Sequence, residues 1–236
     1  MRLKFYYAIV GTFLITEPSI AKKSSHHHQW QKVIPDITKE LLPPETQQEI
    51  EKVFPPKGKM KSKHANGIDA YEEEITLKGE LSLPVHIYGS AVLKSVQTKK
   101  TIEIDDSTVM ENSNVSQLIA HGPLQATTSK IQILKAMGPV KLKDCKVTQK
   151  ATIHGNLNAK KTTFQGPLNV KGDTVILKSS SCQDIVLLSS SILQKVFLEN
   201  TKVDGKIIFE GKPGEVIIQK NSQITGKIKN GNIRTE

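Results

Sequence analysis

The clearest pattern in the chain is a series of short apolar segments separated by small polar clusters. Between residues 175 and 198, the triplets VIL, VLL and VFL follow one another at intervals of about ten residues, with serine-rich stretches between them. Elsewhere apolar residues alternate with polar ones, as in Ile102/Ile104 and Val140/Leu142. This period of two is typical of strands that bury one face. The pattern therefore predicts many short strands joined by tight polar corners.

Glycine marks several of these corners. Four segments (GPLQA, GPVKL, GNLNA and GPLNV) share one template, and they begin at Gly122, Gly138, Gly155 and Gly166. Self-similarity of this kind indicates a repeat architecture, and two half-turns of about ten residues each would make a coil of about 20 residues. We therefore predict an all-β fold, a parallel β-helix (β-solenoid), with Ser, Asn, Asp and Gly at its corners.

An antiparallel sandwich or barrel is the alternative, because evenly spaced short strands also suggest that class. The Asn-Gly and Asp-Gly pairs that favour two-residue hairpins are infrequent, however, and occur at Asn66-Gly67, Asp204-Gly205 and Asn230-Gly231. The solenoid is the preferred interpretation.

The N-terminal part of the chain differs from the rest. Residues 1–21 combine a positive start (MRLK), an apolar run (FYYAIVGTFLI) and a small-x-small end (SIA), which predicts a cleaved signal peptide; an uncleaved anchor is the alternative. Residues 22–68 predict a polar linker with a short helix at about 44–54, bounded by proline pairs. Residues 69–236 form the predicted solenoid. Export predicts a periplasmic or secreted protein without a transmembrane span after cleavage.

The charge is strongly positive but consists almost entirely of lysine. The formal net charge is +10, and the two arginines are Arg2 and Arg234. Because arginine supplies the planar fork that grips phosphates and guanine edges, a lysine-only surface argues against nucleic acid as the partner. Most of these lysines are expected to keep a repetitive surface soluble. An alternative is attachment to anionic envelope polysaccharide, with possible contacts at Lys141, Lys143, Lys160 and Lys161.

Two cysteines, Cys145 and Cys182, follow polar corner residues in the segments KLKDC and KSSSC. An oxidising compartment would permit a disulfide between them. Each also fits as a small inward-facing residue at a corner, and the sequence leaves both possibilities open.

Few residues suggest catalysis, and no cofactor is predicted. Carbohydrate chemistry on a β-helix would need converging carboxylates, and Asp105, Asp173 and Asp184 are the candidates for a glycan-facing surface. Turn-forming roles for these aspartates are the simpler explanation.

The adjacent His26, His27 and His28 are weak candidates for metal binding. His121 and His154 each precede a corner glycine, which favours a stacked corner role over a ligand set. The chain has no G-x-S-x-G elbow, P-loop or dinucleotide fingerprint.

The segments VFLENTKVDGKIIFEG and EVIIQKNSQITGKIKNG combine apolar alternation, a polar corner and the sequence V-D-G-K-I or I-T-G-K-I. In this feature the C-terminal half of the chain resembles bactofilin-like polymer-forming β-solenoids and, more loosely, passenger-type β-helices. The bactofilin resemblance implies a scaffold that assembles end to end without nucleotide, although the export signal departs from that cytoskeletal family. We therefore expect an exported, non-enzymatic scaffold or interaction protein that contacts a protein partner or itself through the solenoid ends. The alternative is a polysaccharide-binding or polysaccharide-cleaving β-helix protein.

Overall fold

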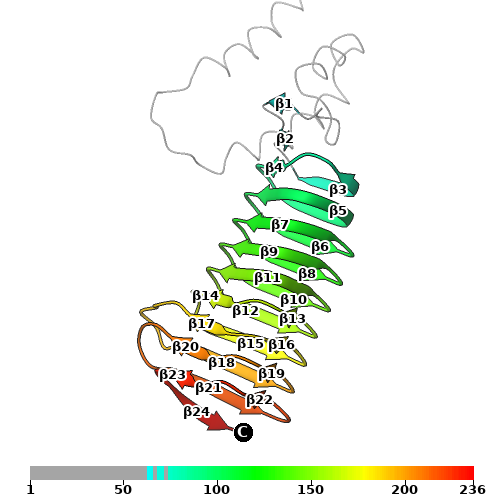
Figure 1. The fold of residues 1–236 in the computed structure, drawn as a ribbon. Helices are drawn as coiled ribbons and strands as arrows, with labels where there is room; N and C mark the ends of the chain where they lie inside the picture. The colour runs from blue at the N-terminus through cyan, green and yellow to red at the C-terminus, as the bar shows by residue number, and fades with distance from the viewer. Residues whose placement is uncertain (1–62, 66–67, 72–73) are drawn as a thin grey trace, which may run out of the picture. The chain divides into compact units, whose positions relative to one another are not determined.

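The computed structural model describes residues 63–65, 68–71 and 74–236, and these form an all-β parallel solenoid of about nine coils (Figure 1). The predicted fold class is confirmed. The signal peptide, the short helix and His26, His27 and His28 lie outside the described residues, so the predictions made for them remain predictions.

Each coil contributes one strand segment to each of three parallel ladders, which we call the first, second and third faces. The strands of the first face are β3 (Ile75–Leu81), β5 (Ala91–Ile104), β6 (Thr108–Glu111), β8 (Leu124–Thr127), β10 (Val140–Lys143), β12 (Leu157–Lys160), β15 (Thr174–Lys178), β18 (Lys195–Glu199), β21 (Gly214–Gln219) and β24 (Gly231–Thr235).

The second face begins with the later parts of β3 and β5, which bend around a corner. It continues with β7 (Asn114–Ala120), β9 (Lys130–Ala136), β11 (Lys146–Ile153), β13 (Thr163–Phe164), β16 (Ser181–Cys182), β19 (Lys202–Val203) and β22 (Gln223–Ile224).

The third face takes the C-terminal parts of β5, β7, β9 and β11 and several short strands. These are β2 (Ile68–Tyr71), β4 (Val85–Ile87), β14 (Leu168–Val170), β17 (Ile185–Leu187), β20 (Ile207–Phe209) and β23 (Ile228–Lys229). Pairing is parallel throughout the described ladders except where β1 (Lys63–Ala65) runs antiparallel to β2.

The coil differs from the predicted pair of ten-residue half-turns. Leu124 pairs with Val140, 16 residues on, whereas Val175 pairs with Val196, 21 residues on. Three strands, not two, make each coil. The ten-residue rhythm between residues 175 and 198 arose because its triplets fall on the first, third and first faces. The second-face strand between them is only Ser181–Cys182, and it could not be recognised in the sequence because it is short and lies in a polar segment.

The irregular glycine spacing has a similar cause. Gly122, Gly138 and Gly155 occupy the corner between the third and first faces, where a Cβ on each would meet the backbone of the coil before. Gly166 instead precedes β14 and turns from the second face to the third. The template is therefore shared by two different corners.

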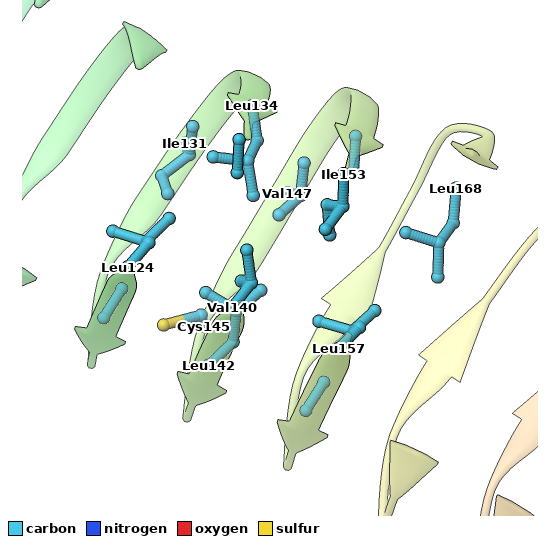
Figure 2. Close-up of a cluster of buried hydrophobic side chains, with 14 of the residues drawn as sticks. Leu124, Ile131, Leu134, Val140, Leu142, Cys145, Val147, Ile153, Leu157 and Leu168 are labelled. Carbon is cyan, nitrogen blue, oxygen red and sulfur yellow. The ribbon is translucent and has the colours of Figure 1, made fainter. Parts of the chain in front are cut away.

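The core is a stack of alternate side chains that point into the coil. Strands β8, β10 and β12 each bury their first and third residues and expose their second. In Figure 2, Leu124, Val140 and Leu157 repeat at one level of successive coils, and Ile131 and Val147 repeat at another. Because like residues lie above one another, each side chain packs on a neighbour of similar shape.

The corner between the first and second faces uses the left-handed backbone conformation. One residue per coil has φ between 48° and 54° at this corner: Ser95, Asn112, Thr128, Asp144, Lys161, Ser179, Asn200 and Lys220. This conformation is uncommon for residues other than glycine, although Asn and Asp tolerate it better than most. One residue at each of these corners, which the sequence predicted to be polar, must therefore adopt a positive φ.

A ladder of small inward side chains follows this corner, one residue further on in most coils. We call it the hydroxyl ladder, and its members are Ser113, Ser129, Cys145, Thr162, Ser180, Thr201 and Ser222. The Ser113 hydroxyl donates to the carbonyl of Glu111 at 2.8 Å and accepts from the Val96 N–H at 2.9 Å. Ser180 does the same with Lys178 and Thr162. The ladder therefore satisfies backbone groups that the tight corner leaves without strand partners.

Candidate functional site

Two surface arrangements on the described residues carry recognisable chemistry. The first is a cluster of two histidines and two carboxylates, which we call the histidine–carboxylate cluster: His86, Glu103, Asp105 and His121. The second is the lysine side, formed by Lys141, Lys143, Lys160 and Lys161.

The solenoid register builds the histidine–carboxylate cluster from residues far apart in sequence. His86 in β4 pairs directly with Glu103 in β5, and both side chains point out of the third face. Asp105 and His121 each follow the last third-face residue of their coil, where their N–H groups donate to the carbonyls of Ile87 and Ile104. Three successive coils therefore place the four groups together.

The polar atoms of the cluster approach one another closely. His86 Nε2 lies 3.1 Å from Asp105 Oδ1, and His121 Nε2 lies 2.9 Å from Glu103 Oε1. His121 Nε2 is also 3.9 Å from Asp105 Oδ1. The imidazole of His86 packs against Tyr88, with ring centroids 4.2 Å apart. These side chains are between 26% and 42% exposed, so a dissolved ion or ligand could reach them from solvent.

The sequence prediction missed this cluster apart from Asp105. The sequence does contain a signal for the cluster, because Glu103 and Asp105 follow His86 by 17 and 19 residues, which is about one coil. That spacing could be recognised only once the length of a coil was known. His121 and His154 do occupy equivalent corner positions, but Met137 lies between them in the register.

The three candidate glycan-facing aspartates lie apart from one another. Asp105 and Asp173 are on the corner between the third and first faces, separated by several coils. Asp184 lies on the corner between the second and third faces, where its Oδ1 accepts a 2.7 Å hydrogen bond from the Lys206 N–H. Two shallow depressions lie elsewhere, along the corner between the first and second faces.

The four predicted polymer-contacting lysines do lie close together. Lys143 pairs in register with Lys160, Lys141 projects from the same strand as Lys143, and Lys161 follows Lys160 at the corner. All four are exposed, and none has an ion-pair partner among residues 74–236.

In the coils that follow Lys160 and Lys161, the lysines on the first face are paired with carboxylates. Lys178 lies 2.8 Å from Glu199, which Lys220 also contacts. Hydrogen bonds from Lys178 and then Lys220 lower the pKa of Glu199 to about 2. This carboxylate is therefore ionised at neutral pH and neutralises charge in its neighbourhood. Beside the four lysines, Asp144 follows Lys143 at the corner, but it makes no ion pair with them within residues 74–236.

Both cysteines are buried and free. Cys145 takes a position in the hydroxyl ladder, where its thiol donates to the Lys143 carbonyl. Cys182 lies beyond it along the second face, in register with Phe164 and Val203. Two coils separate the residues, or about 9 to 10 Å along the stack, which exceeds the reach of a disulfide. Burial raises the pKa of both thiols, that of Cys182 to about 12, so neither is a candidate nucleophile.

Comparison of the chain with protein-family models, curated proteins and solved structures finds no significant match. Within the described residues, no helical segment has the length and hydropathy needed to cross a bilayer. The class of protein is therefore defined by the fold: over the described residues, a three-faced parallel β-solenoid whose surface carries many exposed lysines.

Proposed function

We propose that this protein is an exported, non-enzymatic β-solenoid scaffold that attaches to anionic polymers of the bacterial envelope or extracellular space. The observation that carries the proposal is the group of four exposed lysines on adjacent rungs, without ion-pair partners in the described chain. Lys143 and Lys160 are register partners on strands about 4.8 Å apart, and Lys141 and Lys161 lie beside them, so two adjacent coils gather four positive charges. A polyanion with charges along its length can contact several of these lysines at once.

The proposal predicts that Lys141, Lys143, Lys160 and Lys161, changed together to Gln, will bind an acidic polymer much more weakly. Four exposed charge pairs at roughly 0.5 kcal/mol each amount to about 2 kcal/mol, or about 30-fold in affinity. Retention on immobilised polygalacturonate and dextran sulfate at low salt measures the loss, and the two supports separate carboxylate from sulfate recognition. Binding by the native chain should fade as salt rises, because exposed charges are screened.

A matched control changes Lys99, Lys100, Lys150 and Lys206 to Gln. These exposed lysines lie on the corner between the second and third faces, and their loss gives the same change in net charge. Equal loss of binding in both variants would show that only net charge matters and would contradict a specific lysine side. Cleavage of either polymer, detected as new reducing ends, would favour the polysaccharide-cleaving alternative.

Self-association through a solenoid end is a second proposed interaction. Ile233 in β24 is in register with the fully buried Val216, yet its side chain is 60% exposed. A strand edge with an uncovered apolar side chain favours addition of another strand.

We therefore expect Ile233→Lys to reduce association, because a charged side chain would enter the interface. Sedimentation velocity over a range of protein concentrations measures this. Ile192→Lys is the control, since Ile192 is 57% exposed on a corner rather than on a strand edge. Identical sedimentation of both variants and the native chain would count against association at this edge.

A further inference from the structure

The histidine–carboxylate cluster has no role in polymer attachment or self-association. It lies on the third face and the corner that follows it, whereas the four lysines project from the first face and the corner after it. Its four groups come from three coils, and each presents one nitrogen or oxygen to the others.

We propose that His86, Glu103, Asp105 and His121 bind a divalent transition-metal ion of the zinc class. The ligand atoms of His86, Glu103 and Asp105 all lie within 4.8 Å of one another. His121 adds a second imidazole nitrogen beside both carboxylates. Imidazole nitrogen and carboxylate oxygen are both ligands that zinc accepts, and histidine disfavours the hard ions Mg²⁺ and Ca²⁺.

The spacing suits a tetrahedral ion. Bonds of about 2.0 to 2.1 Å place neighbouring ligand atoms about 3.4 Å apart. The contacts of 2.9, 3.1 and 3.9 Å between the nitrogens and oxygens of the cluster bracket that value. His121 lies outside the group of three whose ligand atoms are all within 4.8 Å of one another, so a bound ion requires the His121 side chain to move towards His86, which these partly exposed side chains can do.

The charge of the surroundings also favours a cation. The chain is basic, yet no lysine occupies the register positions directly beside the four groups. Ile119 follows Glu103 on the third face, Tyr88 precedes Asp105 at the corner, and Met137 follows His121. At these described positions two carboxylates therefore face two imidazoles without a neighbouring ammonium group, and the tilted contact with Tyr88 restricts the orientation of the His86 ring.

A metal ion at this position would link three successive coils through side chains. His86 belongs to the coil of β4, Glu103 and Asp105 to the next, and His121 to the one after. Since ligands that bind only the folded state stabilise it, the metal should raise the unfolding temperature of this end of the solenoid.

The test uses the full chain with His26, His27 and His28 changed to Ser, so that adjacent histidines elsewhere do not bind the ion. Zn²⁺ titration by calorimetry should show one site per chain, and Co²⁺ should give the visible absorption of a tetrahedral centre. His86→Gln and His121→Gln should each weaken Zn²⁺ binding at least about tenfold, since even outer-shell changes commonly cost 10- to 100-fold. Asp105→Asn provides a third variant if either histidine variant folds poorly.

His154→Gln is the matched control. His154 occupies the same corner position as His121, two coils further on, and makes no hydrogen bond or ion pair with a carboxylate in the described chain. Unchanged Zn²⁺ affinity in this control, with a loss in the cluster variants, supports the site. Equal affinity in all variants, or no binding by the parent chain, overturns the proposal and leaves the cluster as hydrogen-bonded surface pairs.

Discussion

Gly155→Ala should destabilise the solenoid by about 3 kcal/mol, at the upper end of the range for overpacking in a rigid interior. A Cβ at this position would lie 2.5 Å from the carbonyl oxygen of Gly138 and 2.9 Å from the nitrogen of Pro139. Both neighbours are backbone atoms of the coil before, so no side-chain rotation relieves the contact. The coils would have to separate locally, which lengthens the hydrogen bonds on either side.

Urea unfolding followed by circular dichroism measures the effect of Gly155→Ala. Asp106→Ala is the matched control, because Asp106 holds the equivalent corner position two coils before Gly138 and already carries a Cβ. Its exposed carboxylate accepts one hydrogen bond from Ser90, so its loss should change the stability by less than about 0.5 kcal/mol. Native stability in Gly155→Ala would show that the corner can spread at little cost.

Ser113→Ala should lower the free energy of unfolding by about 1 to 3 kcal/mol, because it leaves a buried N–H without an acceptor. The Ser113 hydroxyl receives the Val96 N–H at 2.9 Å, and the side chain is only 3% exposed. Alanine keeps the Cβ and removes only the oxygen, so the change isolates the hydrogen bond from packing.

Ser113→Thr should retain most of the stability, since threonine holds the equivalent position at Thr162 and Thr201. Amide hydrogen exchange at Val96 provides a local readout, which should speed up in Ser113→Ala and stay slow in Ser113→Thr. Equal stability of the alanine variant and the native chain would mean that water or another group replaces the hydroxyl.

The strands and their inward faces could be predicted because period-two alternation survives in the longer segments. Val140, Leu142, Ile102 and Ile104 all point inward as their pattern indicates. The number of strands per coil could not be predicted in the same way. A two-residue strand such as β16 buries a single apolar residue, Cys182, and so has no period to detect.

The lysine side could be predicted from the sequence more fully than the histidine–carboxylate cluster. Lys160 and Lys161 are adjacent in sequence, and Lys141 and Lys143 lie two residues apart one coil earlier, so each pair could be named from the sequence without the coil register. His86 and His121 are 35 residues apart, and only a register of three strands per coil superposes them. Asp105 was a candidate together with Asp173 and Asp184, but its partners His86 and His121 lie on neighbouring coils.

The lengthening of the later coils identifies a place for insertion. The extra residues between β17 and β18 form a loop at one corner. The side-chain amide of Gln194 holds the base of this loop by donating to the carbonyls of Leu188 and Gly172. Ile192 and Leu193 at its tip are about half exposed. An epitope or a fluorescent domain spliced between them would leave every ladder intact, which would allow the protein to be tracked in living cells.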